Sequence, residues 1–393
     1  MPGKASLTAF FRTLGPESLV YLYALSIPIS ISASAVAMMA LLLFFFYRYA
    51  RTRDNGLVPR DFWLFVAVFV WQSVSSMANG LWGQFGRNLW DKTPYLTVGS
   101  LKLDKRVLVR VLWILLWTNL LVIAYGLLQK YADFPVLYRE MFSADGRFRG
   151  FSSHPLRFCG YLSTVGILAL SAALFYSRKA YLFFAVISSG VLMTGSRTYM
   201  ISYLLACAAL AFLRSRLAFV RFVYSGVIGL TLLMLAYPPI MARTAATFAM
   251  GHDVIRYRIW DVAWKAYVEN PVFGLGPRQL PGYMAPYAES GYTVISSHAH
   301  NIYLNALAEE GPVGLMLLTA LLVHFLLKYF RAARAAADPV AKVYAAGLFA
   351  ATVNLVVSGL FESHFYTFIT WSLMTFLMGL YEASGRNKAG VRP

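Results

Sequence analysis

The sequence is poor in charged residues, and above all in acidic ones. Only 13% of its 393 residues are charged and 17 are Asp or Glu, whereas a soluble domain has about a quarter of its residues charged. The two cysteines, Cys159 and Cys207, lie within or beside apolar stretches, so we expect small core residues and no disulfide or metal site. No apolar stretch in the first 18 residues resembles a cleavable signal peptide.

Apolar residues make up 59% of the chain, and the mean hydropathy is +0.58. They occur in runs, several of which reach the roughly 20 residues that cross a bilayer core. We therefore predict an all-α integral membrane protein with about 10–12 transmembrane helices. The first run contains Pro28 and forms either a hairpin of two short helices or one kinked helix. The predicted spans are 19–47, 62–81, 107–128, 156–176, 181–195, 198–213, 217–240, 311–330, 341–360 and 364–381.

The formal charge is +18, and its distribution predicts the topology. The basic residues are scattered between apolar runs, which favours anionic headgroups and argues against a nucleic-acid partner. Short basic loops near residues 178–179, 214–221 and 328–342 predict the cytoplasmic side. The basic residues at 48–60 fit that side only if one element between 62 and 106 is miscounted, for example a re-entrant or interfacial segment.

The topology divides the chain into four parts. We predict N-terminal transmembrane helices (1–140), central transmembrane helices (141–241), a helical periplasmic catalytic loop region (242–305), and C-terminal transmembrane helices with a cytoplasmic tail (306–393). The loop region is basic although it lies outside, against the usual bias, so we interpret it as an anion site. Its basic side chains are Arg243, His252, Arg256, Arg258, Lys265, Arg278, His298 and His300.

The most specific motif is Ser296-Ser297-His298-Ala299-His300-Asn301, followed after nine residues by Gly311-Pro312-Val313-Gly314. Ser297 is the predicted N-cap of a helix, which puts His300 in its first turn. There the helix dipole is expected to lower the pKa of His300 and keep it a neutral base. Gly311-Pro312 is predicted to end this helix and start the next. A metal site is not predicted, because His-X-His splays the rings on a helix.

Two more elements supply arginines. Thr194-Gly195-Ser196-Arg197 puts an arginine between two apolar runs, where it is costly and usually functional or paired. Arg256-Tyr257-Arg258-Ile259-Trp260 begins an amphipathic helix with aromatics on one side. The Gly274-Leu275-Gly276-Pro277 turn that follows allows a ligand to approach the backbone.

Together these stretches, from about 145 to 381, resemble the O-antigen ligase and polymerase superfamily. His300-Asn301 with the later Gly311-Pro312-Val313-Gly314 looks like its signature, and Gly195-Ser196-Arg197 and Arg256 with Trp260 resemble other recurrent stretches in the same order. Arg149-Gly150-Phe151-Ser152-Ser153-His154-Pro155 looks like the family's exterior loop before a spanning helix.

The resemblance implies a GT-C-like, metal-independent, inverting glycosyltransferase of the bacterial inner membrane that needs no cofactor. It implies an undecaprenyl pyrophosphate-linked glycan as donor and a periplasmic sugar hydroxyl, such as that of lipid A-core, as acceptor. His300 would be the base, and Arg197 and Arg256 would bind the pyrophosphate. Further candidate substrate-binding residues are Arg258, His298, Asn301, Glu309 (which could orient an arginine or His300) and Arg149.

Three alternatives to an O-antigen ligase remain open from the sequence. A polymerase would extend a second lipid-linked repeat, and an O-linked protein oligosaccharyltransferase would modify Ser or Thr. A transporter of lipid-linked glycans predicts an internal repeat and ionisable residues at mid-span. The sequence shows no repeat, and its ionisable residues concentrate in the exterior loop.

Overall fold

The computed structural model describes residues 15–82, 89–236, 254–363 and 367–389. This part of the chain is all-α and contains no β-strand, only an isolated β-bridge between Phe142 and Phe148. Arg243, His252 and the predicted span ends at 237–240 and 364–366 lie outside the described residues. The helices are α2 (Pro16–Ser26), α3 (Ile31–Thr52), α4 (Phe62–Ala78), α5 (Thr93–Gly99), α6 (Lys105–Tyr131), α7 (Pro155–Phe175), α8 (Ala180–Met193), α9 (Arg197–Arg214), α10 (Arg216–Ala236), α12 (Val254–Glu269), α13 (Leu280–Glu289), α14 (Ile302–Ala335), α15 (Pro339–Ser358) and α16 (Phe368–Ala389).

Five of the described helices, α3, α6, α7, α14 and α15, are long and apolar enough to cross a membrane, and α4 and α8 are apolar but shorter. The predicted class of all-α integral membrane protein is confirmed, while the total of about ten to twelve spans stays a prediction. The first apolar run is broken near Pro28 into α2 and α3, which pack on each other. Of the two forms that the sequence left open, the hairpin is the one observed.

The basic loops meet at one end of the helical bundle, which we call the basic end. Arg214, at the end of α9, and Lys342, in the first turn of α15, both lie over the ring of Phe175 at 5.6 Å. Lys328 of α14 forms ion pairs with Asp61, at the start of α4, and with Glu382 of α16. The loop before α4 therefore joins the same end as the other basic loops.

From the sequence we expect one miscounted element between residues 62 and 106, and helix α5 lies there. Helix α4 runs from the basic end to the opposite end, which we call the outer end because the sequence predicts it to lie outside. There the Asn79 side chain donates to the Gly274 carbonyl at 3.1 Å. Helix α6 starts again at the basic end, where Lys105 pairs with Asp338. Between them α5 has only seven residues, is buried and packs on α16. At a rise of about 1.5 Å per residue it is too short to cross.

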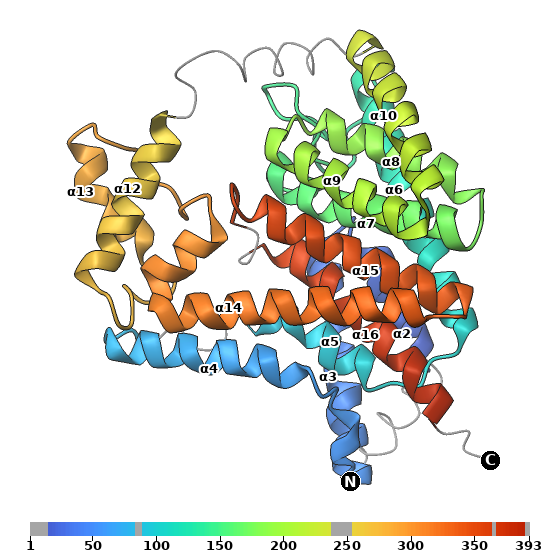
Figure 1. Cartoon of the computed structure of the whole chain (residues 1–393), viewed down its shortest axis with the longest axis horizontal. Coiled ribbons are helices and arrows are strands. Elements are labelled where there is room, and N and C mark those ends of the chain that lie inside the picture. The colour runs from blue at the N-terminus through green and yellow to red at the C-terminus, as the bar shows by residue number, and fades with distance from the viewer. Residues whose placement is uncertain (1–14, 83–88, 237–253, 364–366, 390–393) are drawn as a thin grey trace.

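The outer end carries a small module with its own core. Helices α12 and α13 pack against the first turns of α14 and bury Ile259, Ala263, Leu280 and Met284, separately from the main core of the bundle. Figure 1 shows α12 and α13 at one end of α14, which runs beside α4. Gly311 interrupts α14 with φ 68° and ψ −172°, so the prediction that Gly311-Pro312 separates two helices is confirmed.

Candidate active site

His300 lies just before the first turn of α14. The N-cap is Asn301, whose side-chain oxygen accepts from the backbone N–H groups of Tyr303 and Leu304 at 2.9 and 3.0 Å. The prediction that Ser297 caps this helix is therefore wrong by four residues, and His300 is not in the first turn. Instead, His300 adopts a left-handed conformation with φ 51°, which is uncommon for a residue other than glycine and is often found at functional sites.

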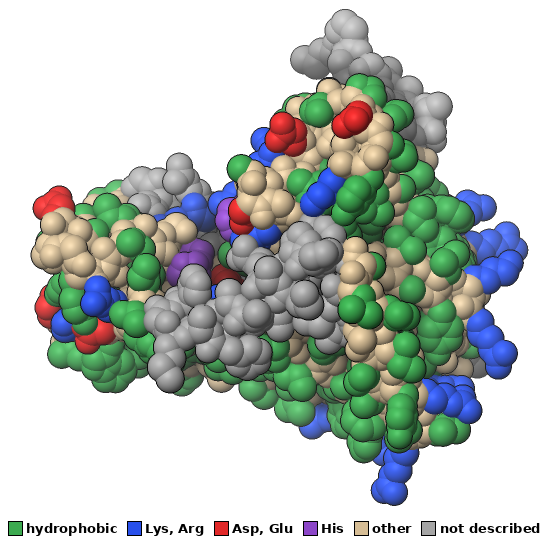
Figure 2. Space-filling model, turned by 90° about the horizontal axis from the view of Figure 1, so that it is seen from above, with side chains coloured by type: hydrophobic (Ala, Val, Ile, Leu, Met, Phe, Trp, Pro, Cys, Tyr) green, Lys and Arg blue, Asp and Glu red, His purple; other side chains and the backbone are tan. Residues whose placement is uncertain are grey.

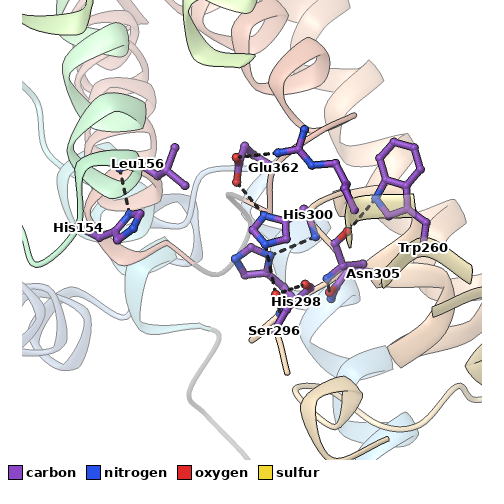
Figure 3. A network of polar contacts seen from close by, with 10 residues as sticks. His154, Leu156, Trp260, Ser296, His298, His300, Asn305 and Glu362 are labelled. Carbon is purple, nitrogen blue, oxygen red and sulfur yellow. Dashed lines mark hydrogen bonds and ion pairs between the residues drawn. The ribbon is translucent and has the colours of Figure 1, made fainter. Parts of the chain in front are cut away.

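Glu362 bridges the candidate base and one candidate arginine (Figure 3). One carboxylate oxygen lies 3.3 Å from Nδ1 of His300, and the other lies 3.8 Å from the Arg256 guanidinium. The Glu362 side chain is only 7% exposed. The backbone around it is fixed, because the N–H of Ile302 donates to the Gly359 carbonyl at 2.8 Å. The α15–α16 connection is thereby tied to the start of α14.

The other ring nitrogen of His300 faces a hydroxyl. Nε2 lies 3.2 Å from Oγ of Ser296. The same oxygen lies 2.7 Å from the carbonyl oxygen of His298, so the single hydroxyl proton is donated to one of these two acceptors at a time. An ionised carboxylate only accepts hydrogen bonds, so contact with Glu362 favours the tautomer with the proton on Nδ1. Nε2 is then the nitrogen available to a hydroxyl.

The loop that holds the histidines is anchored on both sides of Ala299. Trp260 of α12 donates from its indole N–H to the Ala299 carbonyl at 2.9 Å. The Ala299 N–H donates to the side-chain oxygen of Asn305, whose amide donates to Glu309, both at 2.9 Å. The other Glu309 oxygen accepts from the N–H of Leu280 at 3.2 Å. Glu309 thus acts on the histidine loop through Asn305, and its described contacts do not include His300.

Burial and positive charge disfavour protonation of His298. Burial first, and then the neighbouring His300, lower its pKa to about 4 against the opposing effect of Glu362. Arg157 and His154, at the start of α7, also act on this pKa. The pKa of His154 is itself lowered, first by burial and then by Arg147 and Arg157. The beginning of α7 therefore faces the histidine loop, and His298 is a neutral imidazole near pH 7.

Helix α12 separates its two arginines. Arg256 points to Glu362, whereas Arg258 donates to the Tyr292 carbonyl at 3.0 Å and lies 5.3 Å from the centre of that ring. Residues two apart on a helix point in nearly opposite directions. The described contacts therefore bring Arg256, and not Arg258, to His300.

Arg149 and Arg197 are placed less directly. Arg149 donates to the carbonyl of Glu140 at 3.1 Å within its own loop, while its neighbour Arg147 donates to the carbonyl of Thr194 at 2.7 Å. Arg197 is half-buried and begins α9, three residues after that carbonyl. Within the described residues, no contact joins Arg149 or Arg197 to His300. Arg147 and Arg197 instead flank the same turn between α8 and α9.

The glycine turn after α12 approaches protein backbone. A Cβ on Gly274, whose φ is +67°, would lie 2.4 Å from the Glu309 carbonyl carbon. The N–H of Leu275 donates to Ala308 at 3.0 Å, and that of Gly276 to Glu309 at 2.9 Å. The expectation that these glycines let a ligand approach is therefore corrected, since they let the turn dock on α14.

Sequence reasoning missed Glu362 and Arg147, and it gave Ser296 no role of its own within the histidine motif. The available signal for Glu362 was an acidic residue at the edge of an apolar run, in a chain with few acids. Figure 2 shows histidine side chains in a recess between the outer module and the rest of the molecule, with acidic and basic side chains beside them. No group of His, Cys, Asp or Glu suited to hold a metal occurs in the described parts of the chain.

These features define an all-α membrane protein with a recessed polar site at the outer end of its bundle, where a histidine, a carboxylate and an arginine converge. Residues 180–319 match the family described as O-antigen ligase. The match supports, for this stretch of the chain, the resemblance seen in the sequence. It supports an enzyme of the O-antigen ligase or polymerase type, a membrane glycosyltransferase.

The matched region runs from α8 into α14 and includes Arg197, Arg256 and His300, but it ends before Glu362. A comparison with curated proteins gives no match.

Proposed function

We propose that the protein is an O-antigen ligase of the bacterial inner membrane, with its site facing the periplasm. It transfers a glycan from undecaprenyl pyrophosphate to a sugar hydroxyl of lipid A-core. The observation that carries this proposal is the line from Glu362 through His300 to the hydroxyl of Ser296, with Arg256 on the other carboxylate oxygen. The description of the matched family, which names a ligase, supports the same reaction.

In this proposal His300 is the general base. The acceptor hydroxyl takes the place beside Nε2 that Ser296 Oγ occupies, 3.2 Å away, which is within proton-transfer reach. As the hydroxyl oxygen bonds to the anomeric carbon, its proton passes to Nε2. Glu362 holds the Nδ1 proton and stabilises the imidazolium that forms, in the way that a carboxylate supports a catalytic histidine in other enzymes.

The arginines serve the leaving group. The bond between the anomeric carbon and the pyrophosphate oxygen breaks, and the electron pair leaves with undecaprenyl pyrophosphate. The negative charge that develops there is stabilised by guanidinium groups, which bind phosphate oxygens in pairs. Arg256 is the ligand nearest to the base, and Arg197 contributes from the α8–α9 turn. Attack opposite the leaving group inverts the anomeric carbon, and the step uses no metal ion.

The substitution His300→Ala tests the base. In purified protein supplied with an undecaprenyl pyrophosphate-linked glycan and core lipid, we expect turnover to fall about 10²- to 10⁴-fold while donor binding is retained. His324→Ala is the matched control, because His324 lies at the basic end beside Asp61. Near wild-type transfer by His300→Ala would rule out the assignment of His300. Retained glycan movement across the membrane without transfer would indicate a transporter.

A pair of arginine variants tests the leaving-group site. Arg256→Gln should raise the KM for donor and lower kcat, because it removes a charge next to the base. Arg258→Gln removes the same charge two residues away, from a side chain that binds Tyr292, and should change donor use little. Equal losses in both variants would contradict the assignment of Arg256.

The acceptor decides between the members of the superfamily. Core lipid and a second lipid-linked repeat are offered separately to the same preparation, and the extended product is identified by mass. Extension of core lipid is expected for the ligase. Extension of the second repeat alone would make the protein a polymerase.

A further inference from the structure

A large cavity lies away from the histidine loop, among α7, α8, α9 and α10. Its volume is about 1220 Å³, larger than the roughly 300–1,000 Å³ of a site for a drug-sized ligand. It arises because α10 packs on α9, while α8 packs on α7 and α6. Helices α8 and α10 flank the cavity. Figure 1 shows α10 beside α8 and α9 at one edge of the molecule.

The walls of this cavity are mostly apolar and could contact the hydrocarbon chains of a lipid. Its serine hydroxyls and the hydroxyl of Tyr203 already have partners within the protein. The Ser188 hydroxyl and the Tyr203 hydroxyl hydrogen-bond to each other at 2.7 Å, and Ser225 donates to the carbonyl of Phe222 at 3.2 Å. The apolar lining includes Leu170, Leu174, Leu192, Leu204, Leu217 and Leu232.

The mouth of the cavity is cationic. Arg178, Arg214 and Arg221 line it, and they come from the α7–α8 loop, the end of α9 and the first turns of α10. All three belong to the basic end, where Arg214 lies over the ring of Phe175. Figure 2 shows Lys and Arg side chains gathered at the end of the molecule away from the histidine recess. The cavity therefore joins a positive rim at the basic end to an apolar interior.

We propose that this cavity binds an anionic phospholipid from the leaflet at the basic end. Its phosphate lies among Arg178, Arg214 and Arg221, and its acyl chains fill the space between α8 and α10. Arginine is well suited to phosphate, since its planar fork forms paired hydrogen bonds. A glycan donor is a poorer fit, because its pyrophosphate would have to reach His300 at the outer end. This lipid site does not depend on the chemistry proposed for His300.

Binding of defined lipids to the full-length protein tests the proposal. Delipidated protein in detergent is titrated with phosphatidylglycerol or phosphatidylcholine, and the bound fraction is measured by native mass spectrometry. We expect a preference for phosphatidylglycerol that Arg214→Gln/Arg221→Gln removes, with affinity falling about tenfold for each arginine. The control is Arg331→Gln/Arg334→Gln, which removes the same charge at the same end without touching the cavity.

A second variant blocks the acyl chains. Gly226 and Gly229 of α10 line the cavity, and a Cβ on either meets no atom within 4 Å. Gly226→Leu/Gly229→Leu should therefore fill the cavity without a clash and weaken phosphatidylglycerol binding at least tenfold, whereas Gly282→Leu in α13 should not. Unchanged binding in both cavity variants would overturn the proposal. Displacement of the lipid from wild-type protein by equimolar undecaprenyl phosphate would also overturn it, since the occupant would then be the carrier chain.

Discussion

Replacing Glu362 by Gln removes one charge from the centre of the candidate active site and leaves its shape almost unchanged. The carboxylate lies 3.3 Å from His300 and is 7% exposed. At that distance and an effective dielectric constant of about 20, a carboxylate and an imidazolium attract each other by about 5 kcal/mol. The imidazolium exists only after proton transfer, so this attraction favours the transition state over the ground state.

Because solvent and Arg256 compensate part of that attraction, we expect a loss of about 3 kcal/mol, or 10²- to 10³-fold in kcat. The assay is transfer of glycan from undecaprenyl pyrophosphate to core lipid by purified protein, with donor binding measured separately. Donor affinity should change little, and Glu362→Asp should recover part of the rate. Glu289→Gln, an exposed acid at the end of α13, is the control for loss of one negative charge.

The reasoning would be refuted by Glu362→Gln turning over within about threefold of the wild type while still binding donor. Such a result would mean that the proton is removed by a group that does not need this carboxylate. Loss of donor binding with unchanged kcat would equally contradict it, because Glu362 would then act only on the position of Arg256.

Three further predictions concern stability, each measured as the thermal unfolding midpoint in detergent. In the folded protein the pKa of His298 is lowered to about 4 from an ordinary 6.5. As pH drops, the unfolded chain therefore binds a proton at His298 before the folded protein does. The free energy of unfolding should fall by up to about 3 kcal/mol between pH 6.5 and pH 4. His298→Gln should flatten that dependence, and an identical pH profile would contradict the burial of His298. Gly274→Ala should lower the free energy of unfolding by about 1–3 kcal/mol, because φ is +67° and the new Cβ would meet the backbone of Glu309. An unshifted unfolding midpoint would show that the turn can move. Asn301→Ala should lower the free energy of unfolding by about 1 kcal/mol through loss of the N-cap of α14, whereas Asn301→Asp should keep the cap and the stability. Equal losses of stability in both variants would mean that the Asn301 side chain has another role.

The sequence predicted the parts of the fold that depend on local pattern. Run lengths indicated membrane helices, and Gly311-Pro312 marked the break in α14. The N-cap before that break was predicted four residues too early. Ser297 and Asn301 are both good capping residues, and the choice between them depends on the packing of the loop. That loop is held by Trp260 and Asn305, which local propensity does not include.

Of the residues that meet at the candidate site, the sequence singled out His300 and Arg256 but not the carboxylate of Glu362. His300 and Arg256 belong to short motifs with fixed spacing, so their proximity could be inferred from resemblance. Glu362 lies 62 residues after His300, and only the packing of the α15–α16 connection on α14 brings the two together. Likewise, a helical period shows that Arg256 and Arg258 point apart, but it does not show which of them faces the histidine. That choice is made by tertiary contacts.

The tie between the N–H of Ile302 and the carbonyl of Gly359 has a practical consequence for dissecting the protein. The family match ends at residue 319, yet the carboxylate proposed to support the base arrives from beyond that limit, on a loop held by this hydrogen bond. A fragment cut at the borders of the match would keep His300 and Arg256 but lose their shared partner. Supplying residues 339–389 as a separate polypeptide is then the natural complementation experiment, and recovery of transfer would depend on how well the two pieces reassemble.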